Sequence, residues 1–331
     1  MMKKKRFLSI IVIGLALFLS ACGGGGDTDI AIGPPASETN SLSQAILEAY
    51  DIGEGDYTEY QEGFGDAADE VQDGNIDISV GVLGMPAGNI ENLQASTGDV
   101  RLLGLSDDVI EAVEQDTGYE AFTIPSDTYE FMEDDVETVA AYAILMGNTN
   151  TIDEDLGYEL AKSMIENADE NTHAQAEQMT LDNALNGAED LPMHPGAAKY
   201  YEEQGLDFDN PIAELDVDEE KTEYVLGTGS QGGTYYPLGG EMVNIWNDHL
   251  DGSFTNTETG ASIENLATIR DDEMDLGMTV HVPANDAING EGDFEDNEVD
   301  NVAFIGHIYP EIVQIVTRED TGIESFEDVK E

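Results

Sequence analysis

The sequence predicts an α/β protein of two similar lobes that face each other across a cleft. Three observations support this fold class. Two segments of the chain carry the same order of strands, turns and helices, short apolar strands alternate with amphipathic helices in both, and 331 residues are enough for two domains. Because strands that alternate with helices form mostly parallel sheets, a ligand would lie at the turns that follow the strands.

The first segment covers residues 30–82. It predicts a strand at 30–32, a turn at 33–37 and a helix whose apolar residues recur at helical spacing from 42 to 49, with Thr39, Asn40 or Ser41 as its N-cap. A strand at 57–60, a helix around 67–71 and a buried strand at 75–80 complete the unit.

The second segment covers residues 224–280 and repeats this order. Its expected elements are a strand at 224–226, a glycine-rich turn at 227–233, a helix around 242–249, a strand at 253–258, a helix around 263–270 and a closing strand at 273–278. Between the two segments we expect helices at 156–167, capped by Asp153 or Asp155, and at 174–185, followed by an acidic linker at 207–221.

The first 22 residues form a targeting segment. Residues 3–6 are basic, residues 7–19 are apolar, and Leu19-Ser20-Ala21-Cys22 matches the lipobox that is cut before its cysteine in bacterial lipoproteins. A transmembrane helix is the alternative, but the apolar run is short for a bilayer. Because Cys22 is the only cysteine, disulfides are impossible. We expect Cys22 to carry the lipid that anchors the mature protein outside the cell membrane, with residues 23–29 as a tether.

Acidic residues dominate the composition, with 72 Asp and Glu against 11 Lys and Arg and a formal net charge of −61. Nucleic-acid phosphates need a basic face, so no nucleic-acid partner is expected. The 40% hydrophobic content and the apolar periodicity oppose disorder. We therefore interpret the acidity as a surface property. A salty exterior is one hypothesis for its setting, because at about 1 M salt the Debye length is only ~3 Å.

The turn at 227–233 fits G-x-G-x-x-G between a strand and a helix. A dinucleotide site is one interpretation, although a protein outside the membrane has no ready nicotinamide pool. The second is an anion bound at the free N–H groups of a helix that starts near Gly233, and the third is a turn without a ligand. The chain after the targeting segment has only seven basic residues, so a neutral or zwitterionic ligand is easier to accommodate than an anion.

No residue pattern supports catalysis or a cofactor. The five histidines lack the spacing of metal ligands, and the acidic segment 293–301 lacks the glycine of an EF-hand loop, so we expect no metal site. No Ser/His/Asp or Cys/His arrangement can be assembled, so we expect no enzyme and no cofactor.

Seven blocks of sequence are specific enough to compare with a known family. The block GTGSQGGTYYPLG at 227–239 is similar to the opening motif of the TAXI class of solute receptors of tripartite ATP-independent (TRAP) transporters, and ETGASIENL at 258–266 is similar to the next one. Residues 308–311, 317–323, 33–39, 124–129 and 193–201 resemble further blocks. The resemblance covers nearly all of the mature chain and implies a two-lobed periplasmic-binding-protein (venus-flytrap) fold.

The order of these blocks departs from the family. The opening block lies at 227, after the block at 193–206 that normally ends the protein, so the chain resembles a circularly permuted member in which 207–221 bridges the old ends. An error in the gene model is the alternative. Permutation requires the helix expected at 325–330 to lie beside strand 30–32. It divides the chain into lobe II, residues 30–134 plus 312–331, and lobe I, residues 135–311.

The resemblance implies a lipid-anchored extracytoplasmic receptor that passes a small carboxylate or amino acid, such as glutamate or 2-oxoglutarate, to TRAP permease subunits. A receptor that signals instead of transporting is the alternative. The family commonly has Gly where Ala36 and Glu38 stand, and a carboxylate at Glu38 would repel an anion or pair with an ammonium group. The expected ligand-binding residues are Thr228, Ser230, Gln231, Gly232, Gly233, Thr234, Tyr235, Thr259, Gly260, Ser262, Thr279 and Tyr309 on lobe I and Ser37, Glu38, Thr39, Gly84, Met85, Pro86 and Tyr129 on lobe II.

Overall fold

The structure is a computed structural model that describes residues 28–53, 55–217 and 221–330. The targeting segment, Cys22 and the first part of the tether lie outside the described residues. Within the described ranges, no helix has the length and apolar character needed to cross a membrane.

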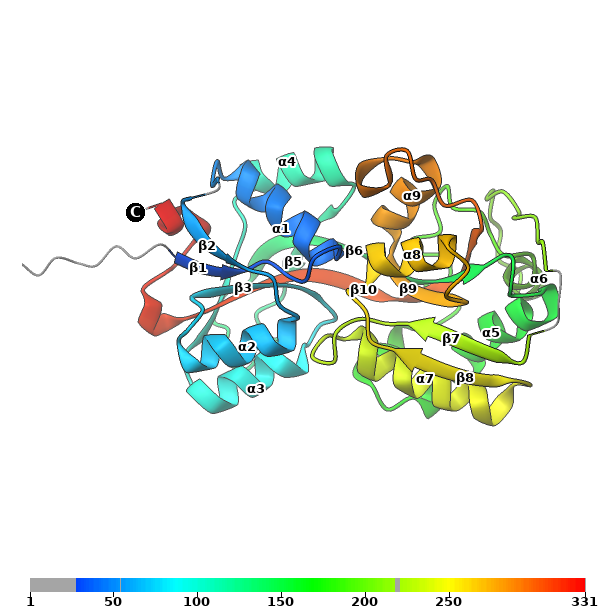
Figure 1. Ribbon diagram of the computed structural model, residues 1–331. Helices are drawn as coiled ribbons and strands as arrows, with labels where there is room; N and C mark the ends of the chain where they lie inside the picture. The colour runs from blue at the N-terminus through cyan, green and yellow to red at the C-terminus, as the bar shows by residue number, and fades with distance from the viewer. Residues whose placement is uncertain (1–27, 54, 218–220, 331) are drawn as a thin grey trace, which may run out of the picture.

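The described strands form one mixed sheet that extends through both lobes (Figure 1). Its main order is β2-β1-β3-β10-β6-β9-β7-β8, while β4 pairs with β10 and β5 pairs with β6. The strands are β1 (Thr28–Ala31), β2 (Tyr57–Tyr60), β3 (Ile78–Leu83), β4 (Val100–Leu103), β5 (Glu120–Ile124), β6 (Val136–Asn148), β7 (Glu223–Gly227), β8 (Ser253–Thr257), β9 (Leu276–Val280) and β10 (Val302–Arg318).

Helices cover both faces of the sheet, as expected of an α/β protein. Figure 1 shows α1 and α4 on one side of lobe II and α2 and α3 on the other, while α8 and α9 lie opposite α7 in lobe I. The α-helices are α1 (Glu38–Ala49), α2 (Phe64–Asp73), α3 (Gly88–Thr97), α4 (Asp107–Thr117), α5 (Glu154–Glu166), α6 (Pro195–Glu203), α7 (Tyr235–His249), α8 (Ser262–Arg270) and α9 (His281–Asn289). The 3-10 helices are η1 (Ala168–Glu170), η2 (Ala174–Gln178), η3 (Gly292–Phe294), η4 (Glu319–Thr321) and η5 (Phe326–Lys330).

The expected repeat of one folding unit is confirmed. The order β1-α1-β2-α2-β3 in lobe II matches β7-α7-β8-α8-β9 in lobe I. In both units the first strand lies between the other two and is parallel to each. The turns that follow β1 and β7 therefore stand at the carboxyl ends of central strands, where sheets of this kind bind ligands.

Two long strands join the lobes and make the sheet mixed, so the expectation of a mostly parallel sheet is wrong. β6 and β10 are antiparallel to each other, β10 is antiparallel to β3, and β6 is antiparallel to β9. Figure 1 shows both strands running from one lobe into the other. The sequence of β10 is apolar at most of its positions, which is typical of a strand that is buried on both faces.

The hydrophobic core divides along these two strands. In lobe I the buried apolar residues come from between Ala143 and Tyr309. In lobe II they come from the parts of the chain up to Ala141 and from Ile312 onward, together with Val280. We use the names lobe I and lobe II for these two cores. The exact division of the chain at 134/135 and 311/312 stays a prediction.

The last described turn packs against the first described strand. Phe326 and Val329 are buried in the same cluster as Ile30, and Phe326 stacks on Tyr50 with ring centroids 5.6 Å apart. Figure 1 shows η5 beside β1 and β2. This segment is a 3-10 helix and not the α-helix that we expect at 325–330.

Two local expectations are wrong because side chains bond to the backbone differently. Ser37 is the N-cap of α1, since its Oγ accepts from the backbone N–H of Asn40 at 3.2 Å. The helix expected at 174–185 is only η2 followed by turns, and the Asn183 side chain donates to the Gln178 carbonyl at 3.0 Å in competition with helical bonding. The expected cap Asp153 of α5 is confirmed.

Candidate functional site

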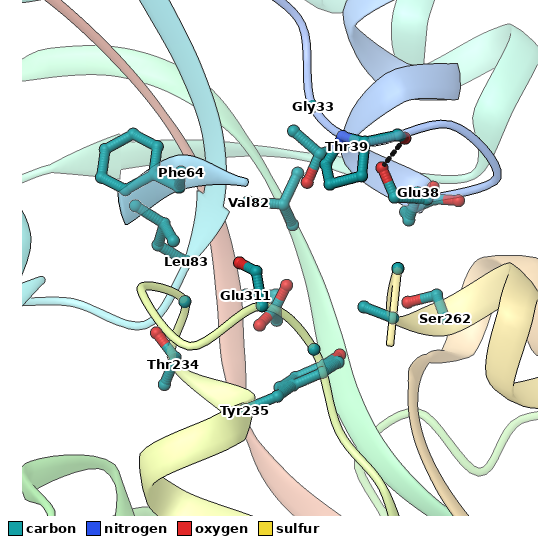
Figure 2. Close-up of a pocket in the computed structure, with 17 residues that line it drawn as sticks. Gly33, Glu38, Thr39, Phe64, Val82, Leu83, Thr234, Tyr235, Ser262 and Glu311 are labelled. Carbon is teal, nitrogen blue, oxygen red and sulfur yellow. Dashed lines mark hydrogen bonds between the residues drawn. The ribbon is translucent and has the colours of Figure 1, made fainter. Parts of the chain in front are cut away.

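A small cavity lies between the lobes, where the turns after β1 and β7 face each other (Figure 2). Its volume is about 60 Å³, which is room for a few water-sized groups. Both lobes contribute to its wall, and β10 contributes Glu311. The lining residues are Gly33, Pro34, Ser37, Glu38, Thr39, Phe64, Val82 and Leu83 of lobe II, Gly229, Ser230, Gly233, Thr234, Tyr235, Gly260, Ala261 and Ser262 of lobe I, and Glu311.

Four of the described helices begin at this cavity. They are α1, which starts at Glu38, α2, which starts at Phe64, α7, which starts at Tyr235, and α8, which starts at Ser262. The first N–H groups of a helix have no partner within the helix and carry a partial positive charge. Ser37 caps α1, whereas no side chain caps α7 or α8. The starts of α7 and α8 can therefore receive an anionic group of a ligand.

Two alanines hold the turns of the cavity in positive-φ backbone. Ala36 has φ +56° in the turn after β1, and Ala261 has φ +69° just before α8. Such angles are unfavourable for a residue with a Cβ and are found at functional sites where the surroundings enforce them.

Two glutamates face the cavity from different elements. Glu38 and Glu311 are 8% and 4% exposed. Burial raises the pKa of each carboxyl to about 8, although the hydroxyls of Tyr119 and Tyr309 act in the opposite direction on Glu38 and Glu311 respectively. The charge of Glu38 also raises the pKa of Glu311. At neutral pH both carboxyls are therefore mostly protonated in the closed cavity.

Three buried tyrosines surround these glutamates. The Tyr309 hydroxyl donates to Glu311 Oε1, and the Tyr119 hydroxyl lies near the Glu38 carboxyl. The Tyr235 ring packs edge-on against Tyr309, with centroids 6.1 Å apart. Burial raises the pKa of all three tyrosines well above the ordinary value, so they remain neutral. The Tyr235 hydroxyl is close to Ser262 but makes no well-formed hydrogen bond with the described residues.

No basic side chain that the structure describes lines the cavity. The six lysine and arginine side chains that the structure describes each pair with a carboxylate away from the cavity. The pairs are Arg101–Glu324, Lys162–Glu159, Lys199–Glu154, Lys221–Asp275, Arg270–Asp271, Arg318–Asp99 and Arg318–Asp320. The two buried glutamates therefore have no positive partner among the described side chains.

The lobes touch across the cleft in a closed arrangement. The backbone N–H of Gly84 donates to Thr234 Oγ1 at 3.1 Å, and the Asn89 side chain donates to the Gly232 carbonyl. A Cβ added at Gly65 in α2 would lie 2.6 Å from the Cα of Gly232, so the two backbones are in direct contact. Closure thus depends on glycines that face each other from opposite lobes.

Further polar bridges lie at the ends of the cleft. The Gln175 side chain of lobe I donates to the carbonyl of Met85 at 3.0 Å, and the Ser41 hydroxyl of lobe II donates to Asp293 Oδ2 at 3.0 Å. Each of these hydrogen bonds joins one lobe to the other, so it forms only when the lobes are close together, and neither bond is part of a hydrophobic core. They can break when the lobes separate and form again when they close.

The structure sorts the expected ligand-binding residues into three groups. Those at the cavity are Ser37, Glu38, Thr39, Ser230, Gly233, Thr234, Tyr235, Gly260 and Ser262. A neighbouring pocket at the cleft edge contains Gln231, Gly232 and Pro86. Neither pocket is lined by Thr228, Thr259, Thr279, Tyr309, Gly84, Met85 or Tyr129.

The residues that line neither pocket include several that form hydrogen bonds within the turns of the site. Thr228 Oγ1 donates to the Thr257 carbonyl at 2.6 Å, and Thr259 Oγ1 lies 2.9 Å from the Thr228 carbonyl. The Tyr129 hydroxyl accepts from the N–H of Ala87 at 2.7 Å. These bonds hold the turns that form the cavity in place.

Sequence reasoning missed Glu311 and the apolar wall of the cavity. Phe64, Val82 and Leu83 line it from α2 and β3. A helix start and an inward-facing strand end look like ordinary core positions in a sequence. Glu311 carried a usable signal, because it is an acid in a strand whose neighbours Ile312 and Val313 are apolar and buried. A carboxyl in such a strand must either be paired or face a cavity.

No cluster of three or more His, Cys, Asp or Glu side chains among the described residues has the geometry to hold a metal ion. His281 and His307 lie in lobe I, where His307 is buried and His281 is partly buried. Burial lowers the pKa of each to about 4, and both rings pack against Tyr142. They act as neutral aromatic side chains in the wall of lobe I.

Comparisons with known proteins find similar solved structures and one matching family model. Among solved structures, the chain is similar to the binding-protein component of an ABC phosphonate transporter from Pseudomonas aeruginosa, with 9% identity, coverage of 89% of this chain and 70% of that chain, and a TM-score of 0.41. It is also similar to a tungstate ABC transporter structure from Geobacter sulfurreducens, with 12% identity, coverage of 92% and 90%, and a TM-score of 0.40. A family model described as the NMT1-like family matches residues 25–205 and 226–331, which is most of the chain. The protein therefore belongs to the NMT1-like family, a family with the periplasmic-binding-protein fold of solute-binding proteins.

Proposed function

We propose that this protein is a lipid-anchored extracytoplasmic receptor that captures a small carboxylate or amino acid between its lobes and delivers it to a TRAP permease. Membership of a family of solute-binding proteins supports binding as its task, because such proteins hold their ligand without transforming it. The observation that carries the proposal is the cavity between the lobes, which residues from both lobes and from β10 line together.

The chemistry of the cavity supports a ligand with a carboxylate. The uncapped starts of α7 and α8 offer backbone N–H groups, and the hydroxyls of Ser230, Thr234 and Ser262 stand beside them. In this proposal these groups bind the carboxylate, and Ser37 and Thr39 contact the ligand from lobe II. The neighbouring pocket with Gln231, Gly232 and Pro86 accommodates a longer side chain.

Closure of the lobes completes the proposed binding cycle. Ligand favours the closed form only if it binds that form better than the open one. A ligand that touches both lobes meets this condition, since it loses half of its contacts when the cleft opens. The closed form would then be the one that the permease subunits recognise.

Circular permutation of the chain is part of the proposal. One observation supports it: residues of η5 and of β1 are buried in the same hydrophobic cluster, so the last and first described elements lie together. A chain rearranged to run from 224 to 330 and on, through a short Gly-Ser linker, from 28 to 205 should fold and bind the same solute. A rearranged chain without a cooperative unfolding transition would contradict this part.

Isothermal titration of the purified protein tests the function. Dicarboxylates and L-amino acids are titrated one by one, in low salt and again in about 2 M KCl. We expect at least one of them to bind with one site per chain. Absence of binding across both panels and both salt conditions would reject the receptor hypothesis.

A further inference from the structure

The cavity contains two buried carboxyl groups and no described basic side chain that could neutralise them. Glu38 and Glu311 are buried in its wall, and no described basic side chain reaches it. A buried carboxylate is costly unless a positive group pairs with it or it accepts several hydrogen bonds. The carboxyls therefore either stay protonated or receive a positive partner from the ligand.

Three oxygen groups at the cavity can accept a further hydrogen bond. Glu311 Oε1 accepts from Tyr309, but its Oε2 accepts no hydrogen bond from the described residues. The carboxyl of Glu38 has only the nearby Tyr119 hydroxyl. The hydroxyl of Tyr235 is buried without a well-formed hydrogen bond. Figure 2 shows Glu311 and Tyr235 next to each other at the centre of the cavity, with Glu38 on the side of α1.

We propose that the ligand carries a protonated amine, and that Glu38, Glu311 and Tyr235 are its binding site. This inference rests on the proposed function and narrows its ligand from any small carboxylate to an amino acid. A primary ammonium group has three N–H donors, one for each of these three oxygen groups. Its carboxylate then faces the starts of α7 and α8, so each end of the zwitterion meets the opposite charge.

A 2-oxo acid fits this cavity poorly. It differs from the matching amino acid only by a carbonyl in place of the ammonium, and it brings negative charge without a positive one. Near Glu38 and Glu311 it could be bound only while both carboxyls stay protonated. The affinity of an oxo acid should therefore fall as the pH rises through 8, whereas the affinity of an amino acid should rise.

Binding of the ammonium is coupled to proton release. The groups around Glu38 are Tyr119, Asp286 and Asp293, and those around Glu311 are Tyr309 and Glu38, so all of its charged neighbours are acidic. At pH 7 the empty cavity holds protonated carboxyls. The ammonium favours the ionised form of one of them, and that carboxyl gives its proton to the solvent. One positive charge enters the cavity and up to one proton leaves, so the charge balances.

The test compares matched pairs of ligands by isothermal titration at pH 7 and 9. The pairs are L-glutamate with 2-oxoglutarate and L-alanine with pyruvate. The proton release is measured at pH 7 by repeating the titration in buffers of different ionisation enthalpy. We expect an amino acid to bind at least ten-fold more tightly than its oxo acid at pH 9, with release of up to one proton at pH 7.

Two variants assign the effect to the cavity. Glu311→Gln removes one carboxyl and keeps its shape, and it should weaken amino-acid binding about 10- to 150-fold, the range for a hydrogen bond to a charged group, while proton release decreases. Glu48→Gln changes an exposed glutamate near the end of α1, outside both pockets, in the same way and should leave both unchanged.

The possible outcomes separate this inference from the proposed function. If an oxo acid binds as tightly as its amino acid at pH 9, the inference is overturned and the receptor function stands. The same holds if an amino acid binds without proton release and Glu311→Gln has no effect. If no ligand of either kind binds, the receptor function fails and the inference fails with it.

Discussion

Replacement of Gly65 by alanine should weaken solute binding without weakening the fold. An added Cβ at this position would lie 2.6 Å from Gly232 Cα and 3.3 Å from Gly232 N, across the cleft. Carbon atoms in contact are about 3.5–4.0 Å apart, so the lobes must separate by roughly 1 Å at this point. The hydrogen bonds from Gly84 to Thr234 and from Asn89 to Gly232 span the same contact.

The magnitude follows from the cost of overpacking. A new Cβ in a close contact costs about 1–3 kcal/mol, and this cost falls on the closed form alone. The apparent dissociation constant should therefore rise about 5- to 150-fold. Gly65 lies in the first turn of α2, where alanine favours the helix by up to about 1 kcal/mol. The melting temperature of the ligand-free protein should stay the same or increase slightly.

The assay is isothermal titration with the best ligand of the panels, together with ligand-free thermal unfolding. Gly240→Ala is the control, because Gly240 also lies in a helix, α7, lines neither pocket, and an added Cβ there would meet only the Asn256 side chain, at 3.7 Å, an ordinary contact. It should bind like the wild type. If Gly65→Ala binds within two-fold of the wild type, the reasoning that binding requires this closed contact is refuted.

Three further predictions concern anchoring, salt and pH. Cys22→Ser should move the protein from the membrane fraction to the medium, and continued detergent-phase partitioning would contradict lipid attachment. With a net charge of −61, the urea midpoint of unfolding should rise between 0.1 and 2 M KCl, and equal midpoints would count against a halophilic setting. The pKa of Glu311 is about 8 in the folded protein, whereas the ordinary value, which applies to the unfolded chain, is 4.5. Between these pH values the folded state therefore binds more protons than the unfolded state. The free energy of unfolding without ligand should then fall as the pH rises from about 5 to 8. Glu311→Gln should reduce this slope by up to one proton in urea titrations, and an unchanged slope would show that Glu311 is not buried.

Local patterns were sufficient to predict the repeated unit. The apolar residues of α1, from Leu42 to Ile46, and those of α7, from Met242 to Trp246, recur at helical spacing, and the strands before them are short and apolar. Such periodicity depends only on which face of an element is buried. The turns at 33–37 and 227–233 follow directly, and with them the position of the cavity.

Contacts between distant residues could not be predicted in this way. The antiparallel pairing of β6 with β10 joins residues more than 150 positions apart, and no local pattern specifies it. The pair of Glu38 and Glu311 arises only when β10 also pairs with β3, which α1 packs against. The same is true of Gly65 and Gly232, whose approach depends on the closed position of both lobes.

Capping and short helices were the other weak point. Several residues near 37–41 can cap a helix, and the choice of Ser37 depends on the exact path of the turn after β1. The segment 174–185 has helical spacing, but the Asn183 side chain donates to the Gln178 carbonyl in a turn instead. Boundaries of this kind depend on side-chain geometry that the sequence pattern does not contain.

Native mass spectrometry of the intact protein after incubation with a mixture of L-amino acids and 2-oxo acids tests the central claim most directly, namely that the cavity between the lobes holds a solute. The account predicts a complex of one chain with one amino acid, which decreases strongly in Gly65→Ala and persists in Gly240→Ala. A spectrum without any bound solute, or an equal complex in both variants, would contradict it.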